Sequence, residues 1–460
     1  MTTKCLHSRQ LFFAIILCSI ISFIAPNFIL PQNSSVQHTS WSYNVPIYEV
    51  NLRQFTEEGT IKAFEKHLPR LKELGVGILW FMPINPIGEL NRKGSLGSYY
   101  SVKDYKALNS EFGTLEDFKS LVKKIHDMGM YVIIDWVANH SAWDNVWKER
   151  HPEFYNKNEG GNYLPPEGTD WSDVIDFNYD NKLLWEYMLD ALRYWIIECD
   201  IDGYRCDVAA MLPIEFWNYA RPELEKLKPV FMLAEAHEVE LHEKAFDMTY
   251  NWELKDIMNR IAQEKNEAKD LYAHIEEEKT QYPADAFRMT FTSNHDENTW
   301  SGTEFERLGD AAEVFAVLSA TLKGMPLVYS GQEAGWTKRI RFFDKDTIIW
   351  TDSKFAKLYT ELFKLKKKNK ALLNGCAGGN VIPIHVENNS VFAFFRERDG
   401  DKILVIMNLS PEANKFVIED KNIEGVYHLF GTNESISHSS KEIFKMDPWS
   451  YKILYRLTDR

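Results

Sequence analysis

The chain has 460 residues, about three times the length of an average domain, which excludes one small module and predicts two or three packed units. Hydrophobic residues make up 45% and charged residues 26%, a globular balance that excludes a disordered chain. The formal net charge of −14 argues against nucleic acid as a partner, because a negative surface repels phosphate backbones. Five cysteines without a C-x-x-C pair exclude a disulfide framework at this size.

The N-terminal segment has the pattern of an export signal. Lys4 and Arg9 precede an apolar run over residues 11–24, which is followed by Ala25 and Pro26. We predict that residues 1–31 form a removable signal peptide or, if they are not cleaved, an N-terminal membrane anchor. The protein is therefore expected to be exported, in secreted, periplasmic or membrane-tethered form. Membrane contact is expected only through this segment, because no other run approaches spanning length.

Apolar runs alternate with helical patterns over residues 44–370. Thr114, followed by Asp117 three residues later, predicts a capped helix start, and residues 61–71 have apolar side chains spaced for one helix face. Eight runs predict strands, at residues 46–51, 77–82, 131–135, 203–207, 230–235, 246–250, 288–293 and 326–330. Apolar strands separated by helices indicate a parallel sheet covered by helices. Eight such units favour a closed (β/α)8 TIM barrel, an α/β fold, over an open doubly wound sheet.

Two segments depart from this alternation. Residues 139–181 are polar and rich in Gly, Pro and Asn, which predicts a small loop insertion on the barrel rim after the third strand. Residues 371–460 contain strand patterns alone, with Asp399 and Gly400 marking a hairpin turn. The predicted strands are residues 391–396, 403–408, 416–418, 425–430, 442–446 and 451–455. We therefore expect a C-terminal antiparallel β-sandwich domain.

Polar residues end several of the predicted barrel strands. The third strand runs into residues 135–140 (DWVANH), the fourth ends at Asp207 after Arg205, the fifth at Glu235, and the seventh is followed by Asp296. In such a barrel the active site lies at these carboxyl ends. Any single acid here could instead be the N-cap of the next helix. Three carboxylates converging on one mouth indicate function, because burying like charges together costs stability.

Paired carboxylates without a metal or cofactor motif are typical of glycoside cleavage. Arg205 lies two residues before Asp207, on the same strand face, and is expected to keep Asp207 ionised as a nucleophile. Glu235 ends an apolar strand, where desolvation should raise its pKa into the range of an acid. If the two carboxyls lie about 5–5.5 Å apart, the reaction retains anomeric configuration.

These segments resemble a known family. Residues 135–140, 203–208, 233–235 and 291–296 are similar, in order and spacing, to the four signature regions of the α-amylase family, glycoside hydrolase family 13. Residues 97–105 (GSYYSVKDY) and 326–333 (PLVYSGQE) also resemble stretches of that family. The resemblance covers roughly residues 45–370 and extends to the C-terminal domain by position only.

The resemblance implies roles for seven residues. The implied catalytic residues are the nucleophile Asp207, the acid/base Glu235 and the third carboxylate Asp296, which holds the 2- and 3-hydroxyls of the distorted sugar. The implied substrate-binding residues are Arg205 beside the nucleophile, the histidines His140 and His295, and the aromatic platform Tyr100. The histidines are expected to be neutral imidazoles that bridge hydroxyls. A packing role for Tyr100, beside Tyr99, is the alternative.

No cofactor is expected to be required, and no metal site is predicted. Family members that bind calcium often have Lys-His three and four residues after the nucleophile, where this chain has Ala210 and Met211. Asn139 matches a calcium-ligating asparagine of the family, so it is the expected ligand only if calcium is bound. Further oxygen ligands could come from Asp170, Asp173 and Asp176.

The sequence thus predicts an exported retaining α-glucan hydrolase that cleaves α-1,4-glucosidic bonds in starch-type polymers or maltooligosaccharides. Two alternatives stay open at this point. One is transglycosylation or isomerisation of an α-glucoside on the same site, in which a sugar replaces water as the acceptor. The other is a non-catalytic glycan-binding or membrane-anchored barrel, against which the three acids argue.

Overall fold

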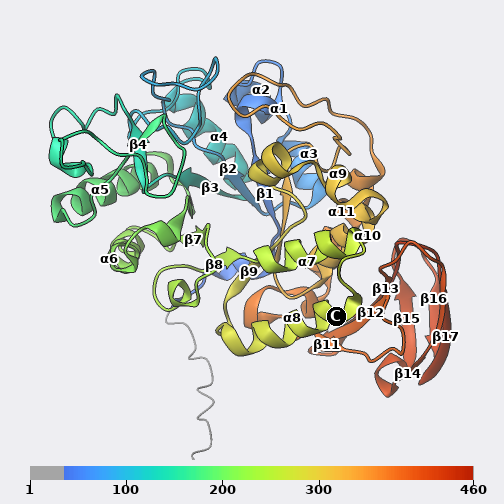
Figure 1. Ribbon diagram of the computed structural model, residues 1–460. Helices are drawn as coiled ribbons and strands as arrows, with labels where there is room; N and C mark the ends of the chain where they lie inside the picture. The colour runs from blue at the N-terminus through green and yellow to red at the C-terminus, as the bar shows by residue number, and fades with distance from the viewer. Residues whose placement is uncertain (1–35, 459–460) are drawn as a thin grey trace, which may run out of the picture.

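The computed structural model describes residues 36–458, so the predicted signal peptide or anchor at residues 1–31 lies outside the described residues. Eight parallel strands form a closed barrel in the order β1-β10-β9-β8-β7-β6-β3-β2 (Figure 1). They are β1 Ile47–Val50, β2 Ile78–Phe81, β3 Tyr131–Trp136, β6 Gly203–Cys206, β7 Phe231–Ala234, β8 Met248–Tyr250, β9 Phe287–Thr290 and β10 Met325–Tyr329. The predicted (β/α)8 barrel is confirmed, with every predicted strand present.

Buried side chains on both faces hold the strands in place. Ile47, Trp80, Ile133 and Phe231 belong to one apolar cluster, whose members come from barrel strands and their immediate neighbours. A second, larger cluster contains alternate residues of the same strands together with the buried faces of the helices. This two-sided burial explains why the strands are continuous apolar runs rather than alternating patterns.

Helices surround the barrel, and helix α4 shows how the sequence starts one. Thr114 Oγ1 accepts a hydrogen bond from the Asp117 N–H at 3.1 Å, and Asp117 Oδ2 accepts one from the Thr114 N–H at 3.0 Å, as the capping box predicts. The helices are α1 Leu52–Phe55, α2 Ile61–Glu65, α3 Leu68–Leu74, α4 Leu115–Asp127, α5 Lys182–Cys199, α6 Ile214–Glu225, α7 Trp252–Ala262, α8 Ala268–Gln281, α9 Glu304–Leu308, α10 Ala312–Thr321 and α11 Lys354–Lys368.

The single helix face expected over residues 61–71 is divided between two helices. Helix α2 ends at Glu65 and α3 begins at Leu68, although the apolar residues of both are buried. Pro69 stands in the first turn of α3. Because Pro69 has no N–H to donate to the main-chain oxygen of Glu65, four residues earlier, and its ring would clash with that oxygen, one continuous helix cannot pass through this point.

The insertion after β3 is a small irregular unit on the barrel rim. It contains strands β4 His140–Ala142 and β5 Val174–Asp176, which pair antiparallel. The Phe177 N–H donates to the main-chain oxygen of Asn139 at 3.1 Å, which ties the end of the insertion to the end of β3. None of the helices between residues 36 and 458 is both long and apolar enough to cross a membrane.

The C-terminal domain consists of an antiparallel six-stranded sheet, β11-β12-β13-β18-β15-β16, and the two-stranded sheet β14-β17. Its strands are β11 Ile382–Pro383, β12 Val391–Arg398, β13 Asp401–Asn408, β14 Asn414–Glu419, β15 Gly425–Leu429, β16 Ser435–His438, β17 Lys441–Met446 and β18 Ser450–Arg456. The six predicted strands are present, and Asp399 and Gly400 turn with positive φ values of 50° and 85°. Strands β11 and β16 were not predicted, because they are short and lack an apolar alternation.

Apolar side chains from both sheets pack together in the C-terminal domain, among them Phe416 and Phe444 of the small sheet and Leu404 of the large one. The domain lies against α8 and α10 of the barrel (Figure 1). The Tyr451 hydroxyl donates to Glu313 Oε1 of α10 at 3.2 Å. The Tyr272 hydroxyl of α8 accepts from the Ala393 N–H at 2.9 Å. The expected β-sandwich is thus confirmed and joined to one flank of the barrel.

Candidate active site

The three predicted catalytic carboxylates line one pocket at the carboxyl ends of the barrel strands. Asp207 directly follows β6, Glu235 directly follows β7, and Asp296 lies six residues beyond β9. The pocket has a volume of about 540 Å³, in the range of small-molecule sites. Three of the four predicted substrate-binding residues, Tyr100, His140 and His295, line it with them. The strand topology therefore brings together residues that are up to 196 positions apart, from Tyr100 to Asp296.

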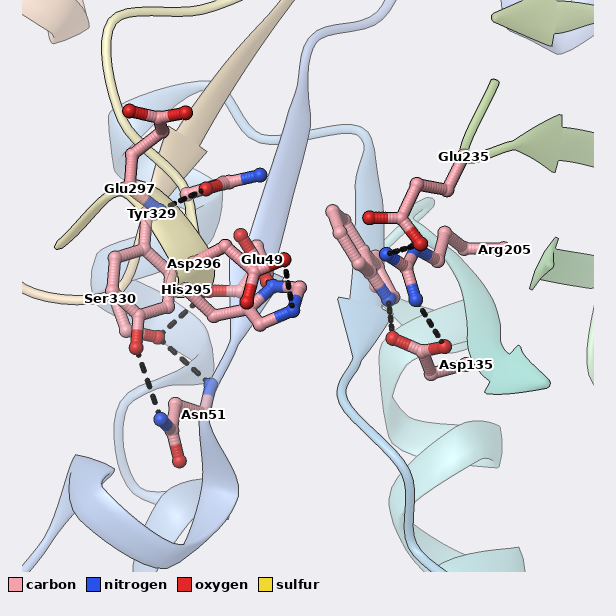
Figure 2. Close-up of polar contacts among 12 residues, drawn as sticks. Glu49, Asn51, Asp135, Arg205, Glu235, His295, Asp296, Glu297, Tyr329 and Ser330 are labelled. Atoms are coloured by element: carbon pink, nitrogen blue, oxygen red, sulfur yellow. Dashed lines mark hydrogen bonds and ion pairs between the residues drawn. The ribbon is translucent and has the colours of Figure 1, made fainter. Parts of the chain in front are cut away.

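The fourth, Arg205, lies beneath the pocket rather than on its surface. The guanidinium is fully buried, with Nη1 at 2.8 Å from Asp135 Oδ1 and Nη2 at 2.8 Å from Glu235 Oε2 (Figure 2). Nη1 also lies 3.0 Å from Asp207 Oδ1. One cation thus supports three carboxylates. Asp135 is the penultimate residue of β3 and was not predicted as a site residue, although it lies in the first signature segment.

Asp207 and Glu235 share a common electrostatic environment. Burial raises the pKa of Asp207 well above its usual range, and repulsion by Glu235 adds to this effect, while Arg205 lowers it. Burial also raises the pKa of Glu235 against the lowering effect of Arg205. Arg205 favours the ionised form of Asp207, as expected, while burial and repulsion by Glu235 oppose it. Each carboxyl therefore affects the titration of the other, as neighbouring carboxylates do.

Val208, next to Asp207, has an unusual backbone. Its φ of 37° and ψ of 47° lie in the left-handed region, which a β-branched residue rarely adopts. This conformation directs the Val208 N–H at Glu235 Oε2, 2.8 Å away. The strain, of order 1–3 kcal/mol, is typical of functional sites. Because Val208 and Arg205 both contact Oε2, they fix the Glu235 carboxyl by one oxygen and leave Oε1 for a ligand.

The two histidines differ in charge. Burial lowers the pKa of His140 to about 3, so its imidazole is neutral, as expected. His295 is equally buried, yet its pKa is raised to about 9, with Asp296 and Glu49 favouring the proton against the effect of burial. The expectation of a neutral imidazole is therefore wrong for His295. Tyr100 connects the site, because its hydroxyl lies 2.8 Å from His295 Nε2 and 3.1 Å from Asp135 Oδ2.

Comparison with known proteins agrees with this geometry. The family profile described as alpha amylase, catalytic domain, matches residues 32–168 and 168–371, well over half of the chain. The chain belongs to the α-amylase family. A profile of the C-terminal domain of the α-amylase SusG matches residues 391–451, so the second domain is also similar to a domain of an α-amylase. The predicted family and its glycoside hydrolase class are confirmed.

Individual α-amylases resemble the chain over most of its length. The maltogenic α-amylase AmyB from Thermotoga neapolitana has a TM-score of 0.82 at 30% identity, covering 90% of this chain and 99% of that one. An α-amylase from Lactobacillus plantarum has a TM-score of 0.82 at 29% identity, covering 91% of this chain and 100% of that one. Alpha-amylase 3 of Dictyoglomus thermophilum is 25% identical over 488 residues, 90% of this chain and 93% of that protein.

The rim of this α-amylase pocket contains aromatic residues that the sequence did not indicate. Trp300 is 55% exposed and lines the pocket together with Trp171, Phe342 and Phe343. Its indole N–H donates to Asp296 Oδ1 at 3.2 Å, from a π-helical turn, Glu297–Ser301. Such turns are common at functional sites. Trp300 lies four residues after Asp296 in the sequence. Its contact with Asp296 depends on the π-helical turn, which the sequence did not predict.

Two of the three acids that could supply further calcium ligands, Asp173 and Asp176, have polar partners within the protein. Lys93 Nζ lies 3.1 Å from Asp173 Oδ1 and 3.4 Å from the main-chain oxygen of Asp170, so an ammonium group occupies their neighbourhood. Asp176 Oδ2 accepts from the Asn156 side chain at 2.6 Å. Among residues 36–458, no group of three or more His, Cys, Asp or Glu side chains is arranged so that it could hold a metal ion. Calcium would therefore have to displace Lys93 from Asp173 and Asn156 from Asp176 before these acids could join Asn139 as ligands.

Proposed function

We propose that the protein is a retaining α-glucan hydrolase that cleaves α-1,4-glucosidic bonds of starch-type polymers or maltooligosaccharides. The observation that carries this proposal is the Asp207–Glu235 pair, held by one buried arginine and facing one pocket with Asp296. Two neighbouring carboxyls, one protonated and one ionised, supply an acid and a nucleophile. The relatives named α-amylase and maltogenic α-amylase support α-glucans as the substrate class.

The reaction takes two steps. Asp207 attacks the anomeric carbon while Glu235 gives its proton to the glycosidic oxygen, so that an ester bond to Asp207 forms as the bond to the leaving glucan breaks. The positive charge that develops on the sugar stabilises ionised Asp207, which assigns the proton to Glu235. Water then attacks the same carbon, Glu235 takes its proton, and the ester bond breaks. Two inversions leave the α-anomer.

The remaining residues hold the sugar at the cleavage point. Asp296, with a side chain 43% exposed, can accept hydrogen bonds from two neighbouring hydroxyls. His140 is neutral, so it can donate to one hydroxyl through one ring nitrogen only. Tyr100 lines the pocket, where its ring can cover the C–H side of a glucose unit.

Product analysis on a maltooligosaccharide ladder tests this function. Purified protein is incubated with single-length substrates, and early products are resolved by length and, with NMR, by anomer. Shorter products released first as the α-anomer are expected. Longer products would assign the protein to glucan transfer, a first-formed β-anomer would overturn the covalent mechanism, and unchanged substrate would leave only a binding role.

Replacing Trp300 by Ala is expected to lower kcat/KM on maltohexaose about tenfold, mainly through a higher KM, because the exposed ring stacks on a sugar outside the cleavage point. Initial rates over a range of substrate lengths check this. Trp300→Phe is the matched control, since it keeps a ring and loses only the N–H that donates to Asp296. Equal kinetics for wild type and Trp300→Ala would exclude the stacking role.

We propose that the enzyme requires no calcium. Dialysis against EDTA is expected to leave activity within about twofold, and the unfolding temperature unchanged, because Lys93 and Asn156 already engage Asp173 and Asp176. Differential scanning fluorimetry and rate assays before and after dialysis measure both quantities. A fall restored by Ca²⁺ and not by Mg²⁺ would contradict the proposal.

We also propose that the protein is exported, on the basis of the charged and apolar pattern of residues 1–31. Fractionation of the source cells, with N-terminal sequencing of the mature chain, distinguishes a cleaved signal peptide from a retained anchor. A full-length chain in the cytoplasmic fraction would contradict export.

A further inference from the structure

Glu49 is a fully buried acid in the strand β1, between the apolar residues Tyr48 and Val50. Its Oε1 lies 2.5 Å from His295 Nδ1 (Figure 2). Its Oε2 is also buried and has no hydrogen-bond partner. Burying an acid costs free energy that a purely structural residue would recover through a full set of hydrogen bonds. The His295 contact is therefore the feature that accounts for this carboxylate.

The neighbouring hydrogen bonds fix which way protons point. Asp135 is ion-paired with Arg205 at 2.8 Å, so its carboxylate can only accept hydrogen bonds. Tyr100 has one hydroxyl proton, which it donates to Asp135 Oδ2 at 3.1 Å. The Tyr100 oxygen is thereby left as an acceptor for His295 Nε2 at 2.8 Å. His295 Nε2 therefore carries a hydrogen.

Groups on several elements act on His295. Glu49 faces Nδ1 from β1, and Asp296 Oδ2 lies 3.3 Å from Nε2. Burial lowers the pKa of His295 and Arg205 on β6 lowers it further, but Asp296 and Glu49 outweigh both and raise it to about 9. The pKa of Glu49 is also raised, chiefly by burial. The two shifts agree on one physical point: the Glu49–His295 pair retains its proton across the neutral pH range.

We propose that Glu49 is a positioning residue of the active site, which keeps both ring nitrogens of His295 protonated so that Nε2 remains a hydrogen-bond donor on the side of Tyr100, Asp296 and the pocket. This inference rests on the proposed glucan hydrolysis for its effect on rate. Without Glu49, His295 becomes a neutral ring with one N–H. The single proton can then settle on Nδ1, which turns Nε2 into an acceptor facing the Asp296 carboxylate.

The test replaces Glu49 by Gln in the full chain, a change that preserves shape and removes the charge. Protein labelled with ¹³C and ¹⁵N in histidine is titrated by NMR from about pH 5 to pH 10, and His295 is assigned by its absence in His295→Asn. We expect the pKa of His295 to fall from about 9 in the wild type to the value of free imidazole, about 6.5, or lower. The value of kcat/KM is expected to fall about 10- to 100-fold. In the pH profile of kcat/KM, the decline on the alkaline side should begin at lower pH.

Glu333→Gln is the matched control, because Glu333 is equally buried and contacts Arg70 at 2.8 Å and Tyr48, not His295. It should leave the His295 titration unchanged. Glu49→Asp, which keeps the charge, should restore part of both readouts. An unchanged His295 pKa in Glu49→Gln would overturn the proposal, even if activity fell. If the wild type failed to cleave glucans, the NMR titration would still decide the role of Glu49.

Discussion

Glu235→Gln is expected to lower kcat/KM on maltooligosaccharides by about 10³- to 10⁴-fold, and Asp207→Asn by at least as much, with the fold unchanged. Glutamine cannot donate a proton to the leaving oxygen, and asparagine cannot form the ester with the anomeric carbon. Both amides keep the shape of the side chain and can still contact Arg205. Initial-rate assays on purified variants, with circular dichroism spectra for folding, measure the effect.

A substrate whose leaving group needs no proton distinguishes the two variants. On α-maltosyl fluoride, Glu235→Gln should form the covalent intermediate quickly and hydrolyse it slowly, so that mass spectrometry detects a maltosyl group on the protein. Asp207→Asn should form none. Glu240→Gln, an exposed acid five residues beyond Glu235, serves as the control and should behave as wild type. Wild-type turnover of glucans by either active-site variant would refute the assigned roles.

Much of the fold could be predicted because its determinants are local in sequence. Each barrel strand is buried on both faces, so it appears as a short apolar run between helical patterns. The capping box at Thr114 and the turn at Asp399 are likewise formed by neighbouring residues. The break between α2 and α3 was not predicted, although Pro69 is a local signal for it. The polar strand β16 was not predicted because its apolar pattern is weak.

The candidate site could be predicted only as far as residues occur in motifs at strand ends. The acids Asp207, Glu235 and Asp296 were identified in this way, and the structure gathers them at one pocket. Their charge states were not predictable, because they depend on burial and on partners from other strands. His295 shows this most clearly: besides its sequence neighbour Asp296, it contacts Glu49, 246 residues away, in a strand that appears purely structural in the sequence.

Arg396→Met is expected to lower the free energy of unfolding by about 3–5 kcal/mol and to uncouple the two domains. Arg396 is fully buried in β12 and donates to main-chain oxygens of both the barrel and the segment that joins the domains. The acceptors are Thr321 at 3.0 Å, Leu322 at 2.7 Å, Leu373 at 3.1 Å and Gly379 at 2.9 Å. Methionine fills a similar volume but leaves these carbonyls without their donor.

Urea unfolding, followed by tryptophan fluorescence and circular dichroism together, measures both effects. The variant should show two separate transitions, because the C-terminal domain loses the hydrogen bonds that connect it to the end of α10. Arg398→Met is the matched control on the same strand, since Arg398 is exposed and its nearest acid is Asp399 at 3.8 Å. It should change stability by less than about 0.5 kcal/mol. A single transition at the wild-type urea concentration in Arg396→Met would show that apolar packing, rather than this arginine, joins the domains.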